Sequence, residues 1–183
     1  MIYKGSEQIQ DIYIGGTKIE EVYYGSELVY GSGYPSGTVL FESGTPGTYT
    51  LTVERNCTVR LDMCGGGGGG SLDITEGVST GGSAGYVYGD INLLQGTYSV
   101  IVGSGGQIGN KGGDSSFLGN VAGGGYGGSG KHDGDGGSTT VVTQGLTGSN
   151  GSSGSSSGRI GSYGAGGYST DSGTSGYIKI EVV

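Results

Sequence analysis

The chain has 183 residues, a formal net charge of −8 at pH 7, and 48 glycines, only nine of which precede residue 65. An acidic chain disfavours a nucleic-acid partner, which requires a basic stripe, and no apolar run approaches the ~20 residues that span a bilayer, so we expect no membrane insertion. Hydrophobic residues make up only 32% of the chain, with 14 tyrosines and no tryptophan, so we expect a small apolar core.

Residues 1–30 form a threefold repeat, IYKGSEQIQD, IYIGGTKIEE and VYYGSELVYG, and MIYKGSEQ lacks the apolar core of a Sec signal peptide. The dipeptides Gly5-Ser6, Gly15-Gly16 and Gly25-Ser26 favour two-residue hairpin turns, because glycine supplies a positive φ. The repeat therefore predicts a β-meander with strands near 7–14 and 17–24. Its imperfect alternation requires either bulges near residues 10–11 and 20–21 or two covered faces.

Three short strands leave open edges and bury little surface. We therefore expect residues 1–30 to be an attachment or oligomerisation module that forms a homotrimer or docks on another protein. A meander that packs on the chain's own C-terminal domain is the alternative.

Residues 31–37 (GSGYPSG) have the composition of a linker, and strand-like segments recur after it. No window has a 3.6-residue apolar period, so the sequence predicts an all-β domain over residues 38–183. The expected strands are 38–43, 48–54, 57–63, 85–91, 97–103, 139–143 and 176–183.

The two cysteines flank the alternating segment TVRLDM. If this segment is one strand, Cys57 shares the face of Val59 and Leu61, and Cys64 points to the other face. The two would lie roughly 23 Å apart at ~3.3 Å per residue, which is too far for a disulfide. We expect two free structural thiols, as in a reducing cytoplasm.

Several glycine motifs imitate ligand sites. GYGGSGKH at 125–132 resembles a phosphate-binding loop, but His132 replaces the Ser/Thr, and neither this motif nor GxGxxG at 123–128 precedes a helical pattern. Asp133 and Asp135 lack the later oxygen ligands of a calcium loop. With one histidine and no paired carboxylates, the sequence favours neither an enzyme nor a metal or cofactor site.

Six consecutive glycines follow the strand at 57–63; they are Gly65, Gly66, Gly67, Gly68, Gly69 and Gly70. Glycine and serine at this level often indicate disorder, but strands recur throughout and the chain closes on GYIKIEVV. Collagen is excluded because G-X-Y periodicity is absent. The remaining reading is a buried polyglycine II helix, whose outward N–H and C=O groups bond to neighbouring rods at 103–113 and 123–130. Only glycine permits such packing, so Gly123, Gly124 and Gly125 are also expected to be structural.

The order VRLDMCGGGGGG, GGSAGYVYGDINL, GTYSVIVGSGG, GGDSSFLGNVAGGGYGG and GTSGYIKIEVV over residues 38–183 resembles the glycine-rich domain of phage tail and receptor-binding-tip proteins. It is also similar to the glycine-rich, TNF-like region of anaplastic lymphoma kinase. The resemblance implies a jelly-roll or TNF-like β-sandwich that carries polyglycine II helices. It further implies a virion protein assembled in the host cytoplasm, with other virion proteins as partners through residues 1–30.

The implied function is adhesion at a tail or fibre tip to a glycan or protein of the host surface; a non-adhesive head fibre, decoration or baseplate protein is the alternative. Connections between rods gather at their ends, where polar residues are displayed. The candidate receptor contacts are Tyr126, Lys131, His132, Asp133 and Asp135, an aromatic ring with both charge signs that would suit a sugar. A solvated turn without a function is the other interpretation of this cluster.

Overall fold

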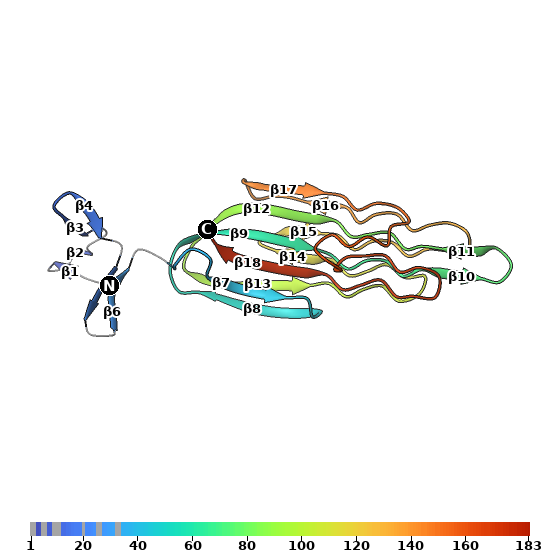
Figure 1. Cartoon of the computed structure of the whole chain (residues 1–183), viewed down its shortest axis with the longest axis horizontal. Helices are drawn as coiled ribbons and strands as arrows, with labels where there is room; N and C mark the ends of the chain where they lie inside the picture. Colours follow the sequence, from blue (N-terminus) through green and yellow to red (C-terminus); the bar gives the residue numbers. More distant parts are fainter. Residues whose placement is uncertain (1–2, 5–6, 9–11, 20, 25–26, 32–33) are drawn as a thin grey trace.

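The computed structural model describes residues 3–4, 7–8, 12–19, 21–24, 27–31 and 34–183, and within them the chain is all-β without a helix. Two five-stranded antiparallel sheets form a β-sandwich, from which long glycine-rich segments run toward one end of the molecule (Figure 1). The first sheet has the order β17-β12-β9-β18-β7, and the second has the order β16-β15-β14-β13-β8.

The sandwich strands are β7 (Val39–Ser43), β8 (Gly47–Val53), β9 (Cys57–Cys64), β12 (Tyr86–Leu93), β13 (Gly96–Val102), β14 (Ser115–Phe117), β15 (Asn120–Ala122), β16 (Thr139–Thr140), β17 (Leu146–Ser149) and β18 (Tyr177–Val182). All seven strands expected from the sequence between residues 38 and 183 are present. The strands β14, β15 and β17, and the hairpin of β10 (Ser71–Asp73) and β11 (Gly77–Ser79), were not predicted.

Alternating side chains of the two sheets form one core. On β9 the inward residues Val59, Leu61 and Met63 are fully buried, while the outward Arg60 is exposed. Phe117 of the second sheet and Ile180 of β18 belong to the same buried cluster. Successive strand residues point to opposite faces, so this spacing gives each sheet one apolar face to pack on the other.

Both cysteines are free, as the sequence predicted. Cys57 packs against the core from the face of Val59, and Cys64 is buried where β9 ends. Burial raises the pKa of the Cys64 thiol to about 12, against small opposing contributions from hydrogen bonds and Arg159. The thiol at this position is therefore a small packing group.

The N-terminal repeats form three hairpins: β1 (Tyr3–Lys4) with β2 (Glu7–Gln8), β3 (Ile12–Ile14) with β4 (Thr17–Ile19), and β5 (Glu21–Tyr24) with β6 (Glu27–Gly31). Gly15 and Gly16 have φ of +59° and +85°, as the expected two-residue turn requires. Among the described residues no strand of one hairpin pairs with a strand of another, so the module is three separate two-stranded sheets rather than one continuous meander. The bulge expected near residues 10–11 lies outside the described residues, as does residue 20 of the bulge expected near 20–21. The described β5–β6 pairing shifts its register between Val22 and Tyr23, close to that second position.

The expected linker is shorter than residues 31–37. From Tyr34 onward the chain belongs to the sandwich, because the Tyr34 ring packs against the core and its hydroxyl accepts a 2.8 Å hydrogen bond from the Glu54 amide. The Gly37 amide also donates to the Val182 carbonyl at 2.8 Å. The sandwich thus begins before the first expected strand.

Candidate functional site

The six glycines after β9 form a buried central segment, Gly65 to Gly70, surrounded by other glycine-rich segments. The first three N–H groups donate to carbonyls of segments 82–85, 110–113 and 171–174, in that order. The last three donate to the same three segments in the same order. The carbonyls from Gly66 on also accept in a three-residue order, from segment 125–128, then from segment 106–109, then from Gly167. All these N–O distances are 2.7–3.3 Å. The partners therefore repeat every three residues, and the segment has six neighbours.

Gly68 and Gly69, in the second half of the central segment, show the rotation directly. The Gly68 amide donates to the Gly82 carbonyl and the Gly69 amide donates to the Asn110 carbonyl, both at 3.0 Å. The Gly68 carbonyl accepts from the Gly167 amide at 2.8 Å. Both glycines therefore join neighbouring segments through their backbone groups.

Close packing of backbones explains why this segment is glycine. A Cβ at Gly67 would lie 1.8 Å from the Ala165 carbonyl oxygen, and one at Gly66 would lie 1.9 Å from that of Ser104. At Gly68 and Gly69 a Cβ would likewise come within 2.0 Å of a neighbouring carbonyl oxygen. None of the six glycines has a positive φ. Glycine is thus needed here for its missing Cβ, in contrast to turn glycines that are needed for their backbone conformation.

Segment 123–128 repeats the same arrangement. A Cβ at Gly124 would meet the Gly112 carbonyl oxygen at 2.0 Å, and one at Gly125 would meet that of Gly82 at 1.9 Å. Gly123 is buried and donates to the Ser138 carbonyl at 2.8 Å. The expected neighbours of the central segment, 103–113 and 123–130, are both in place. Segments 81–85, 134–138, 151–155, 164–167 and 171–176 join the array as well.

The array ends in a cluster of turns away from the sandwich, which we call the distal end: residues 71–79, 107–110, 126–133 and 168–171. Figure 1 shows the β10–β11 hairpin projecting beyond the other segments there. The Gly70 amide donates to the Asp171 carbonyl at 3.0 Å, and the Ser169 amide donates to that of Ser79 at 3.2 Å. Four stretches far apart in sequence therefore meet at one end.

The distal end exposes large apolar side chains. Ile74, in the turn of the β10–β11 hairpin, is 95% exposed. The other exposed apolar or aromatic residues of this end are Leu72, Val78, Ile108, Tyr126 and Tyr168. Leu72 and Val78 are cross-strand partners, so they lie on one face of the hairpin.

The Ile74 turn is held by Asp73. One carboxylate oxygen, Oδ1, accepts from the Thr75 hydroxyl at 2.6 Å, from the Thr75 amide at 2.7 Å and from the Glu76 amide at 3.0 Å. These hydrogen bonds, with that from the Thr75 hydroxyl the strongest cause, lower the pKa of the Asp73 carboxyl. The turn that displays Ile74 is therefore preorganised.

The sequence-predicted contact residues lie at or beside the distal end, in different settings. Tyr126 is half exposed, with the Lys111 ammonium 5.4 Å from its ring centroid. Lys131 and His132 are exposed in the turn that Ser129 and His132 close with two mutual 2.9 Å backbone hydrogen bonds.

The two aspartates of the predicted cluster contact the scaffold. The Asp133 carboxylate accepts from the Thr80 amide at 2.7 Å, and that of Asp135 accepts from the Ser153 hydroxyl at 3.2 Å. Asp133 thus has a structural role that the sequence did not indicate. The β10–β11 hairpin was missed altogether; its signal is SLDITEGVS, with Leu72 and Val78 placed symmetrically about an Asp-x-Thr turn.

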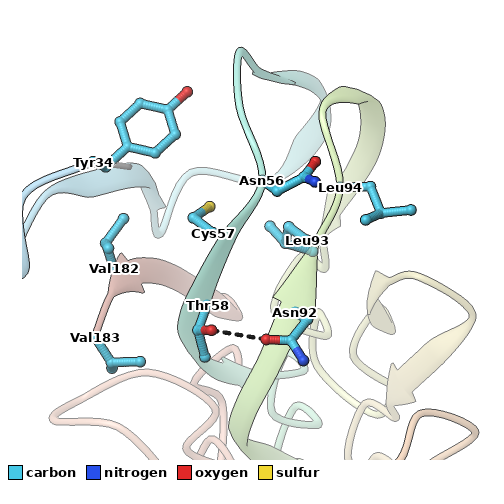
Figure 2. Close-up of a pocket in the computed structure, with 9 residues that line it drawn as sticks. All are labelled: Tyr34, Asn56, Cys57, Thr58, Asn92, Leu93, Leu94, Val182 and Val183. Atoms are coloured by element: carbon cyan, nitrogen blue, oxygen red, sulfur yellow. Dashed lines mark hydrogen bonds between the residues drawn. The ribbon is translucent and has the colours of Figure 1, made fainter. Parts of the chain in front are cut away.

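A shallow cavity of about 390 Å³ lies at the opposite end of the sandwich (Figure 2). Among its lining residues the Thr58 hydroxyl donates to the Asn92 side-chain oxygen at 2.7 Å, and burial raises the pKa of the Cys57 thiol. The lining side chains include no carboxylate, imidazole or amine; they are Tyr34, Asn56, Cys57, Thr58, Asn92, Leu93, Leu94, Val182 and Val183. The cavity therefore supplies no acid–base pair.

Within the described ranges no group of three or more His, Cys, Asp or Glu side chains could hold a metal ion. The same ranges hold no helix long and apolar enough to cross a membrane.

A model of a known protein family matches most of the chain. The family model described as "Glycine-rich domain" matches residues 43–180. This range includes the whole array and the sandwich strands, except for β7 before Ser43 and β18 after Ile180. No curated protein matches the chain.

Proposed function

Because the chain belongs to the glycine-rich domain family, we propose that it is a non-enzymatic adhesion module, in which a rigid glycine array carries a receptor-binding surface at its distal end. The observation that carries the proposal is the 95% exposed Ile74 on a turn fixed by Asp73. Removing one such side chain from water is worth about 1.5–3 kcal/mol, which is a reason to expect a partner at this position.

The array suits the role of a rigid support. The central segment repeats its hydrogen-bond partners every three residues and has no positive φ, as in a left-handed helix without internal hydrogen bonds. We therefore interpret the array as packed polyglycine II helices. The N–H and C=O groups of the central segment are held by six neighbouring segments, so bending one segment would break bonds to several others. A distal surface on such a support keeps its shape before it binds.

The resemblance to phage receptor-binding-tip proteins supports a position for this module on a virion. In this proposal residues 1–30 attach the chain to other virion proteins, or to its own copies as a trimer. The short hairpins of that region offer the unpaired strand edges that such attachment uses. The receptor is a protein or glycan of the host surface.

Binding to cells tests the proposal. The fluorescently labelled full chain is added to a panel of bacterial strains, and Ile74→Asp and the double variant Tyr126→Ala/His132→Ala are compared on any strain that binds it. Asp133 is left unchanged, because it supports the Thr80 backbone.

Leu94→Asp is the matched control, because Leu94 is also an exposed apolar residue (66%) but lies at the opposite end of the sandwich. We expect the control to bind like the wild type and the two distal variants to lose at least tenfold in affinity. If the distal variants and the control bind alike, the distal surface is not the receptor site. A chain that binds no strain would favour the non-adhesive virion component.

A further inference from the structure

The two outer faces of the sandwich differ in charge. On the first sheet the outward residues carry charges in adjoining positions, among them Arg60, Asp62, Asp90, Lys179 and Glu181. Many are paired: the Arg60 guanidinium lies 3.0 Å from the Asp90 carboxylate, and Lys179 pairs with Glu181. This face therefore carries charges of both signs, some of them in ion pairs.

The outer face of the second sheet has no charged residue on its strands. The register joins one outward residue from each of the five strands into a single row, formed by Thr48, Ile101, Ser116, Val121 and Thr140. Beside it stand Thr50 with Ser99, and Thr52 with Thr97. Among residues 34–183, Glu54 directly follows β8 and the Lys111–Asp114 ion pair (2.8 Å) directly precedes β14.

Apolar side chains are exposed within and beside the uncharged face. Ile101 is 39% exposed in the middle row, Leu118 follows β14, and Val142 stands near Gly119. A shallow hollow of about 360 Å³ lies between Thr97, Ser99, Ile101 and Leu118. An apolar centre with a hydroxyl-rich surround is the usual layout of a protein interface.

We propose that this face is a self-association surface that binds the same face of a second copy of the chain. Each copy carries a net charge of −8, so two copies repel through most of their surfaces. If two copies meet through the uncharged face, the like charges of one copy lie farthest from those of the other. A differently charged partner would instead be drawn to the charged surfaces, and one self-complementary face pairs naturally about a two-fold axis.

The size of the face sets the expected strength. Five strands at ~4.8 Å and, along the two longest strands, seven residues at ~3.3 Å give a surface of at most roughly 20 Å by 20 Å. This is below the ~800 Å² per partner of a standard interface. The association is therefore weak and depends on concentration, and it adds to any oligomer formed by residues 1–30.

Sedimentation velocity of the full chain over a wide concentration range tests the proposal. The variants Ile101→Lys and Thr50→Glu each place like charges opposite one another in the paired faces. We expect each to weaken the concentration-dependent step at least tenfold. The control is Val39→Lys, an equally exposed β-branched residue (44%) of the first sheet, which should associate like the wild type.

Circular dichroism and thermal unfolding verify that each variant is folded, and the two test variants stand on different strands. A wild type that does not associate further with concentration overturns the proposal. So do test variants that associate unchanged, or a control weakened as much as they are. Association lost at raised salt also overturns it, because that dependence would mean ion pairs between the copies.

Discussion

Adding one methyl group at Gly67 should destabilise the whole protein. The Cβ of Gly67→Ala would lie 1.8 Å from the Ala165 carbonyl oxygen, whereas real Cβ contacts essentially never fall under 3.0 Å. Segment 164–167 or the central segment must therefore move by more than about 1 Å. The Gly67 amide donates to the Thr174 carbonyl at 2.9 Å and its carbonyl accepts from the Gly106 amide at 2.8 Å, and such a shift breaks bonds of this length.

The expected magnitude follows from the buried groups left without partners. Each costs about 1–3 kcal/mol, so at about 2 kcal/mol apiece two or three broken bonds cost roughly 4–6 kcal/mol, a large part of a typical total stability of about 5–15 kcal/mol. For a chain of this length this corresponds to a fall in Tm of roughly 10–20 °C. Thermal unfolding followed by circular dichroism measures it.

Gly96→Ala is the matched control. Gly96 starts β13 without a positive φ, and a Cβ added there would have the Tyr98 hydroxyl oxygen as its nearest atom, at 3.8 Å, so a methyl group fits. We expect Gly96→Ala to change Tm by no more than about three degrees, because no contact is lost. A Gly67→Ala protein that melts within about two degrees of this control would refute the packing argument.

Four further outcomes are expected. Gly124→Val should lower Tm at least as much as Gly67→Ala, because its Cβ would lie 2.0 Å from the Gly112 carbonyl oxygen; a near-wild-type Tm would place this glycine in a loose segment. An aromatic disulfide reagent should label Cys57 but not Cys64 in the folded chain, and both in denaturant; rapid labelling of Cys64 would contradict its burial. Because the pKa of the Cys64 thiol is raised to about 12 in the folded state, the free energy of unfolding should fall as pH rises from about 9 toward 12. An NMR titration should give the Asp73 carboxyl a pKa below 3.8, and an unshifted pKa would mean that the turn is open. The stability that the Asp73 hydrogen bonds add to the hairpin turn is then complete above pH 3.8 and is lost as pH falls through the folded pKa. Light scattering on the full chain and on residues 34–183 should show a larger particle for the full chain if residues 1–30 self-associate; equal monomers would leave only docking on another protein.

The strand pattern was largely readable from the sequence, because the core strands alternate regularly. The segment 57–63 places Val59, Leu61 and Met63 on one face, and these residues are the centre of the core. The strand expected at 139–143 ends at Thr140 for a reason outside its own sequence. The amides of Val142 and Thr143 donate to the Asn120 side-chain oxygen instead of to a neighbouring strand.

The site was less predictable, since its geometry depends on segments distant in sequence. The central glycines could be recognised as buried, but their neighbours at 81–85 and 171–174 contain Ser83, Ala84 and Thr174, which hide the pattern. Asp133 was read as a surface charge because its partner, the Thr80 amide, is 53 residues away. The N-terminal repeats gave the correct Gly15-Gly16 turn, but turn signals do not specify whether strands pair across successive repeats.

Amide hydrogen exchange of Gly65 to Gly70 is the most direct test of the hydrogen-bonded glycine array. With selectively labelled glycine, each of these amides can be followed by NMR in deuterated water. All six donate to carbonyls of neighbouring segments, so we expect protection comparable to that of the β9 amides beside them, such as Leu61. Exchange of Gly65 to Gly70 at the rate of unstructured glycine, while Leu61 stays protected, would contradict the array and the rigid support built on it.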